Sequence, residues 1–139
     1  MLQTLPWGRW RVLEDWKIKI AVLWSLVEFC MIAFAMVLKA IPMETAAETT
    51  PGEVLAIAIS SLIPPIMAFL SLTLKDSINR WVNIILGIVF IVLIPIGSGF
   101  ELIPAAYLPS AIVTAIVQVA ALVLIVWYAR KSKQKTELH

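Results

Sequence analysis

The sequence predicts an all-α membrane protein, namely a four-helix transmembrane bundle with both ends in the cytoplasm. Apolar residues make up 61% of the 139 residues, charged residues make up 14%, and the mean hydropathy is +0.95. A soluble domain of this composition would expose large apolar patches, so lipid is the expected solvent. Because one span needs about 20 apolar residues, we expect four spans and no separate soluble domain.

Four apolar runs separated by turn-forming residues give the predicted spans, at about 17–41, 53–74, 78–96 and 105–129. Thr50, Pro51 and Glu53 have the pattern of a helix start. Thr50 would cap the helix, Pro51 needs no amide hydrogen in the first turn, and Glu53 can reach back to the cap. A tight turn at 75–77 makes the second and third spans an antiparallel hairpin.

The segments outside the spans are amphipathic or basic. In residues 1–16, tryptophan and leucine alternate with charged residues. Apolar spacings of three and four there predict a short helix lying in the membrane interface. The alternative for this segment is a tail that its tryptophans anchor. Residues 130–139 form a basic cytoplasmic tail.

Lysine and arginine residues lie on one side of the predicted spans. Ten of the eleven fall in the N-terminal segment, in the turn between the second and third spans and in the C-terminal tail, and only Lys39 lies towards the other side. Basic residues favour the cytoplasmic side of a membrane. We therefore expect a multi-pass protein of the cytoplasmic (inner) membrane with both ends inside. Trp16, Trp81, Trp127 and Tyr128 form an aromatic belt at the same boundary.

Glu28 is the first candidate for a functional residue. It lies eleven residues after Lys17, which is about 16 Å along a helix and so close to the bilayer centre. An ionised carboxylate there is costly, so we expect Glu28 to be protonated, paired or in contact with water. Ser25 lies on the same face, among mostly small residues that suit close helix contact. A purely structural hydrogen bond is an equally weighted alternative to a binding role.

Gln118 of the fourth span is predicted to lie at the depth of Glu28, because it is eleven residues before Ala129. Thr114 lies one turn earlier on the same polar stripe. We therefore predict a hydrogen bond between Glu28 and Gln118 across the bundle. For the threonine and serine hydroxyls, ordinary helix packing is the stronger alternative.

Two adjacent prolines interrupt the second span near the same depth. Pro64 and Pro65 remove two backbone donors and leave carbonyls free nearby. Ser60 and Ser61, one turn earlier, are therefore candidate binding residues. Free backbone groups at membrane depth must be buried in protein or line a water-filled cavity.

Three residues at the start of the third span are candidates for the lipid interface. Arg80, Trp81 and Asn83 could bind a lipid phosphate, because the guanidinium group fits phosphate geometry. An ordinary helix anchor is the alternative.

Several function classes are excluded by residue counts. The chain has one cysteine, Cys30, and one histidine, His139, so an internal disulfide and a His/Cys zinc site are ruled out. No Ser/His/Asp set, glycine-rich phosphate loop or carboxylate pair on one span can be read. We expect no enzymatic activity, no cofactor and no metal. Nucleic-acid binding is not expected either, because topology accounts for the basic residues.

Three stretches carry a family resemblance. They are 13–19 with the Leu23–Trp24 pair, 63–87, which includes Asn-Arg-Trp-Val-Asn-Ile-Ile-Leu-Gly at 79–87, and 124–129 (Leu-Ile-Val-Trp-Tyr-Ala). Together they resemble a domain-of-unknown-function family of small prokaryotic four-span integral membrane proteins. The likeness covers roughly residues 13–129, and the Asn-Arg-Trp segment is its most specific part. It implies the four-span architecture and no established activity.

Two function classes remain open. The first is a small transport or permeation protein in which Glu28 is a protonatable or cation-binding group. The second is a non-catalytic membrane scaffold or accessory subunit that binds a partner protein or lipid. A water-filled cavity at Glu28 would favour the first, and a dry core with a large apolar outer face would favour the second. Four spans enclose little volume, so a homodimer is also expected.

Overall fold

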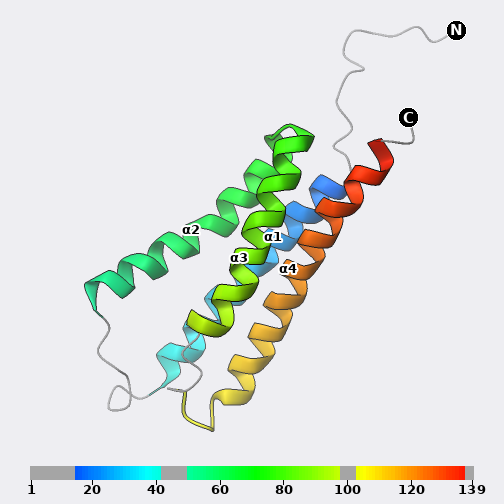
Figure 1. Cartoon of the computed structure of the whole chain (residues 1–139). Helices are drawn as coiled ribbons and strands as arrows, with labels where there is room; N and C mark the ends of the chain where they lie inside the picture. Colours follow the sequence, from blue (N-terminus) through cyan, green and yellow to red (C-terminus); the bar gives the residue numbers. More distant parts are fainter. Residues whose placement is uncertain (1–14, 42–49, 98–102, 137–139) are drawn as a thin grey trace, which may run out of the picture.

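The computed structural model describes residues 15–41, 50–97 and 103–136. It contains four helices: α1 (Asp15–Ala40), α2 (Pro51–Thr73), α3 (Asp76–Gly97) and α4 (Leu108–Thr136) (Figure 1). Each is long and apolar enough to cross a membrane, and no strand occurs among the described residues. The predicted four-helix membrane bundle is confirmed. The interfacial helix expected at 1–16 falls almost entirely outside the described residues.

The four helices alternate in direction. The start of α1, the α2–α3 turn and the end of α4 therefore lie together at one end of the bundle (Figure 1). We call this the terminal end, and the opposite end the loop end. α1 packs against both α2 and α4, and α3 packs against α4, whereas α2 and α3 make few direct contacts.

The start of α2 follows the sequence prediction. The Glu53 backbone N–H donates to Thr50 Oγ1 over 3.3 Å, and the Thr50 backbone N–H donates to Glu53 Oε2 over 2.7 Å. Pro51 occupies the first turn. This reciprocal pair satisfies two backbone donors that a helix start leaves free, so the sequence defines this helix start locally.

The fourth helix differs from its predicted bounds of 105–129 at both ends. Residues 105–107 form a turn, in which the Tyr107 N–H donates to the Pro104 carbonyl over 2.9 Å. The helix begins at Leu108, so Pro109 falls in its first turn, where a missing N–H costs nothing. At the other end α4 continues to Thr136, so most of the predicted basic tail is helical.

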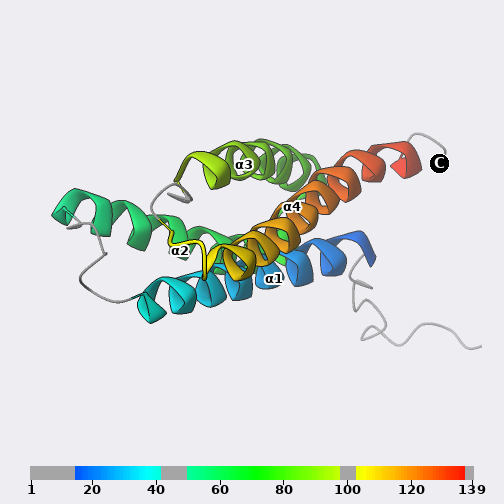
Figure 2. The same ribbon diagram turned by 90° about the horizontal axis from the view of Figure 1, so that it is seen from below.

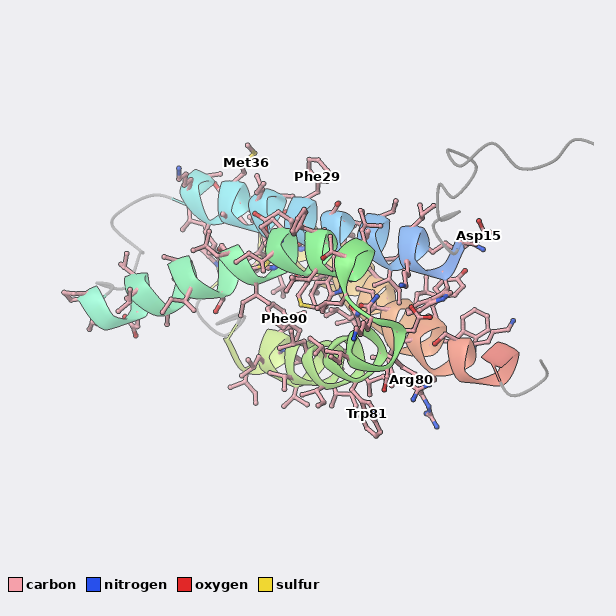
Figure 3. The ribbon with its side chains drawn as sticks, turned by 90° about the horizontal axis from the view of Figure 1, so that it is seen from above. Asp15, Phe29, Met36, Arg80, Trp81 and Phe90 are labelled. Atoms are coloured by element: carbon pink, nitrogen blue, oxygen red, sulfur yellow. The ribbon has the colours of Figure 1, made fainter. Side chains whose placement is uncertain are left out.

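The hydrophobic core lies towards the terminal end. The Trp24 and Phe90 rings meet there edge to face, with centroids 5.8 Å apart. Around them pack fully or almost fully buried apolar side chains from α1, α2 and α4, namely Ile20, Val27, Met67, Ala121, Leu122, Ile125 and Ala129. Most other large apolar side chains are exposed, as expected of surfaces that face lipid. Phe29 and Met36, for example, point away from the bundle (Figure 3).

The loop-end half of α2 leaves the bundle. Residues 51–59 are all exposed, whereas Pro64, Met67 and Ser71 further along the helix are buried. Figures 1 and 2 show this half of α2 diverging from the other three helices. The change occurs near Pro64 and Pro65, and sharp bends in helices are characteristic of proline.

Candidate functional site at two polar levels

A buried polar cluster joins α1, α2 and α3 near the terminal end. Trp24 Nε1 donates to Asn83 Oδ1 over 2.6 Å, and Ser71 Oγ donates to the same oxygen over 3.3 Å. Asn83 Nδ2 donates to the Asn79 carbonyl (2.7 Å) and to Asn79 Oδ1 (2.5 Å). Asn79 Nδ2 in turn donates to the Ser71 carbonyl over 2.7 Å.

These four residues form a closed hydrogen-bond network. Trp24, Ser71, Asn79 and Asn83 are all 0% exposed. Every polar group of Asn83 has a partner, so its burial carries no unpaired-group penalty. A satisfied network of this kind orients the helices rigidly. We therefore interpret this cluster, called the polar lock below, as structural.

An ion pair fixes the register of α1 against the α2–α3 turn. Lys17 Nζ pairs with the Asp76 carboxylate and donates to the Leu74 carbonyl over 3.3 Å. Leu74 is the residue that ends α2. The start of α1 and the end of α2 are thus at one level in the bundle.

Glu28 belongs to a second polar level, midway along α1. It follows Lys17 by eleven residues, or about three helical turns, so both lie on the same face. Because Lys17 reaches the end of α2, this spacing places Glu28 on the side of α1 that is turned to α2. Its Oε2 atom is buried and has no hydrogen-bond partner. An unpaired buried carboxyl oxygen is rare in native structures and calls for an explanation.

The stretch of α2 at that level carries the double proline. Eleven residues back from Leu74 is Ile63, so Pro64 lies close to the depth of Glu28. Pro64 and Pro65 have no N–H, so the carbonyls of Ser60 and Ser61 lack their usual helical donors. Ser60 and Ser61 are half-buried, and Ser60 Oγ donates to the Ala56 carbonyl over 2.7 Å.

The predicted hydrogen bond between Glu28 and Gln118 is not formed among the described residues. Gln118 is buried, and it lies on the same side of α4 as the buried Leu122. The buried Oε2 of Glu28 nevertheless has no partner. Counting residues predicted a common depth for the two side chains, but it could not predict whether they meet.

The other predicted hydroxyl residues bond within their own helices. Ser25 Oγ donates to the Ala21 carbonyl over 3.1 Å. Thr114 Oγ1 is within hydrogen-bond distance of the Ser110 and Ala111 carbonyls, at 3.2 and 2.9 Å. Back-bonding of this kind satisfies a hydroxyl without a ligand, which fits the packing interpretation of both residues.

Two shallow grooves between helices are almost wholly apolar. One, of about 480 Å³, lies between α1 and α2, and its only polar lining residue is Ser25. The other, of about 500 Å³, lies between α3 and α4 near Pro95. Glu28 lines neither groove. Both grooves have the character of lipid-facing seams.

The three residues predicted for the lipid interface separate in the structure. Trp81 is 58% exposed and Arg80 is half-buried beside it at the terminal end (Figure 3). Asn83 is instead fully buried, and the polar lock uses its amide completely. Asn83 is thus not placed to bind lipid phosphate, because it points into the bundle.

Aromatic and basic side chains meet at the terminal end. Lys19 lies 5.6 Å from the centre of the Tyr128 ring, and Lys131 lies 4.8 Å from that of Trp127. The two rings are themselves in contact, with centroids 4.9 Å apart. Such contacts suit an aromatic belt at headgroup depth.

Sequence reasoning missed most of the polar lock. Trp24, Ser71 and Asn79 were not among the predicted site residues, although two signals were present. Asn79 and Asn83 are four residues apart, hence on one helix face, and Trp24 stands inside a span rather than at its edge. Amides and an indole N–H within spans indicate bonding between helices.

The fold and the buried polar groups define the class of this protein, which is a multi-pass helical membrane protein. Within the described residues, no group of three or more His, Cys, Asp or Glu side chains could hold a metal ion. Models of known protein families, curated proteins and solved structures give no match to the chain. The resemblance to a family of small four-span proteins therefore stays a prediction.

Proposed function

We propose that the chain is a small transport or permeation protein of the cytoplasmic membrane in which Glu28 binds a proton or a cation. One observation carries the proposal: the buried Oε2 of Glu28 has no hydrogen-bond partner. A structural glutamate at mid-membrane would use both oxygens in hydrogen bonds, as Asn83 uses its amide. Intramembrane acids that lack such partners mark ion or proton pathways.

The surroundings of Glu28 support the same function. By residue count from the contact of Lys17 with Leu74, Glu28 lies at the level where Pro64 and Pro65 leave two carbonyls without helical donors. Transporters place discontinuous helices and their free backbone groups at midplane sites. A carboxyl group opposite free carbonyls provides oxygen atoms of the type that bind protons and hard cations.

A second function, a non-catalytic scaffold or accessory subunit, has its own observation in favour. Residues 51–59 of α2 are exposed on every side. In that function the uncovered half of α2 would be the contact surface for a partner protein or for a second copy of the chain. The apolar grooves also fit this alternative better than they fit a polar pathway.

Infrared difference spectroscopy in lipid tests the role of Glu28. The difference between the wild type and Glu28→Gln isolates the carboxyl band of Glu28. We expect this band to change reversibly as the buffer pH is varied, because protons must reach the group. Glu53→Gln is the matched control. The Glu53 carboxylate at the start of α2 is exposed, so its band shows how a solvent-accessible carboxyl group responds to pH. A Glu28 band that stays protonated through alkaline pH would contradict the proposal and favour the scaffold.

Proton flux distinguishes transport from simple exchange. Liposomes that contain the protein and a trapped pH-sensitive dye are given a potassium diffusion potential. We expect a dye response with the wild type and with Glu53→Gln, and its loss with Glu28→Gln. If Glu28 titrates but Glu28→Gln leaves the flux unchanged, Glu28 is not on the pathway.

A further inference from the structure

The two halves of α2 are held very differently. From Pro64 to Ser71 the helix is packed in the bundle, and the polar lock binds it through the Ser71 hydroxyl and carbonyl. Residues 51–59 are all exposed, and that half diverges from the bundle (Figures 1 and 2). The polar lock thus anchors residues 64–71 of α2. Residues 51–59 are not covered by any of the other described helices.

Unsatisfied polar groups from two helices lie at the level where these halves meet. On α1, the buried Oε2 of Glu28 has no partner. On α2, the carbonyls of Ser60 and Ser61 lack helical donors because of the prolines. Ser60 shares its helix face with the buried Pro64 and Met67, since the spacings are four and three residues, so this face is turned towards the bundle.

We propose that Pro64 and Pro65 form a hinge, and that the loop-end half of α2 closes on α1 when Glu28 is protonated. A protonated carboxyl group is a hydrogen-bond donor, and it would bond to the free carbonyl of Ser60 or Ser61. An ionised carboxylate only accepts hydrogen bonds, so it cannot pair with a carbonyl, and the open arrangement is favoured. Protonation of Glu28 thereby sets the position of α2.

This inference rests on the proposed function, because both assign the protonatable group to Glu28. It adds the structural consequence of the proton, which is the opening and closing of the space between α1 and α2. Hinge motion of one helical segment against an anchored bundle is a common form of switching.

No other charged side chain faces the middle of the bundle from the described helices. Charged residues are absent from 54–74 of α2, 81–97 of α3 and 108–129 of α4. On α1 itself, the Cys30 thiol is two residues from Glu28 and so lies on nearly the opposite side of the helix. A pH response of α2 at this depth can therefore be assigned to Glu28.

Distances between spin labels, measured by pulsed electron paramagnetic resonance in lipid nanodiscs, test the hinge. In a Cys30→Ala background, labels at Met36→Cys and Ile57→Cys report the gap beside the loop-end half of α2. Both positions are well exposed, at 67% and 60%. Label 57 is about 10 Å along the helix from Pro64, so a rotation of about 20° at the hinge moves it by roughly 4 Å. We expect a shorter distance at low pH.

A second pair of labels on the same two helices serves as the matched control. Val22→Cys and Phe69→Cys are also exposed, at 62% and 66%, but lie on the anchored side of the prolines. We expect their distance to be independent of pH. A change in this pair equal to that between 36 and 57 would show rigid movement of the whole of α2 and would overturn the hinge.

Variants of Glu28 assign the effect. Glutamine carries amide donors and cannot ionise, so Glu28→Gln is expected to keep the short distance at every pH. Glu28→Ala is expected to keep the long distance.

The double variant Pro64→Ala/Pro65→Ala restores both backbone donors, so it should lose the pH dependence while the control pair shows that the bundle is intact.

Two further results would overturn the inference. One is a distance between positions 36 and 57 that does not respond to pH in the wild type, and the other is a response that survives in Glu28→Ala. If the infrared band of Glu28 titrates but this distance is constant, the hinge fails while the proposed function stands. If Glu28 does not titrate, the proposed function fails, and the hinge that depends on it fails as well.

Discussion

Trp24 and Glu28 stand one turn apart on α1, yet their polar groups are in opposite situations. The indole N–H of Trp24 donates to Asn83 inside the polar lock, whereas Oε2 of Glu28 has no partner. In lipid, an unpaired polar group is costly. This contrast supports a structural role for Trp24, and it is the basis of the role proposed for Glu28.

The structural role of Trp24 predicts a loss of stability in Trp24→Phe. Without the indole N–H, Asn83 Oδ1 keeps only the longer hydrogen bond from Ser71. We expect the free energy of unfolding to fall by about 1–3 kcal/mol, measured by reversible unfolding in mixed detergent and SDS micelles with circular dichroism as readout. Trp81→Phe is the control, because the Trp81 ring is 58% exposed, and its expected change is within about 0.5 kcal/mol. Equal losses in both variants would show that Trp24 contributes only apolar volume.

Among the helices, α3 and α4 come into close contact at Gly87. A Cβ atom on this glycine would lie 2.6 Å from Val126 Cγ2 on α4 and 3.7 Å from the Leu122 carbonyl. Small residues let transmembrane helices approach in this way. Valine in a helix has one strongly preferred rotamer, so a rotamer change of Val126 that would relieve the clash costs free energy. Gly87 therefore sets the distance between the two helices.

Gly87→Ala is accordingly expected to destabilise the bundle by about 1–3 kcal/mol through overpacking. The double variant Gly87→Ala/Val126→Ala removes the clash and should recover most of that loss in the same unfolding assay. Gly52→Ala is the matched control, because a Cβ there has only Thr50 Oγ1 within 4.0 Å. Its expected effect is neutral or slightly stabilising, since alanine favours the helix. A Gly87→Ala variant as stable as wild type would mean that α3 and α4 separate at no cost.

The helices themselves could be predicted because their causes are local. Runs of apolar residues gave the four spans, and the capping residues Thr50 and Glu53 gave the start of α2 to within two residues. The end of α4 was missed because its last turns lie beyond the apolar run. Residues 130–136 include one arginine, three lysines and one glutamine, which are good helix formers, so the helix continues without an apolar pattern.

For the candidate site, residue counting predicts only the depth of each side chain. Counting residues from a helix end placed Glu28 and Gln118 near one level, because the rise per residue is fixed. Which side chains meet depends on how each helix is rotated and packed, and a single sequence does not contain that information. The pairing of Glu28 with Gln118 failed for this reason, and so did the assignment of Asn83 to the lipid surface.

For the whole molecule, the orientation in the membrane is the property that charge predicts. An even number of spans puts the start of α1 and the end of α4 at one end of the bundle (Figure 1). The positive-inside rule predicts that this end is cytoplasmic, because it carries the basic residues Lys17, Lys19, Arg80, Arg130 and Lys131.

We expect a fluorescent protein fused to the C-terminus to be bright in a bacterial host, and alkaline phosphatase fused there to be inactive. The same phosphatase fused after Met43, between α1 and α2, should be active, which controls for its export and folding. Phosphatase activity at the C-terminus with loss of fluorescence would reverse the orientation, and equal activity at both positions would show that the chain inserts both ways. Either result would place residues 51–59 of α2 on the other side of the membrane, or on both sides. In the proposed function, it would also change the side from which protons reach Glu28.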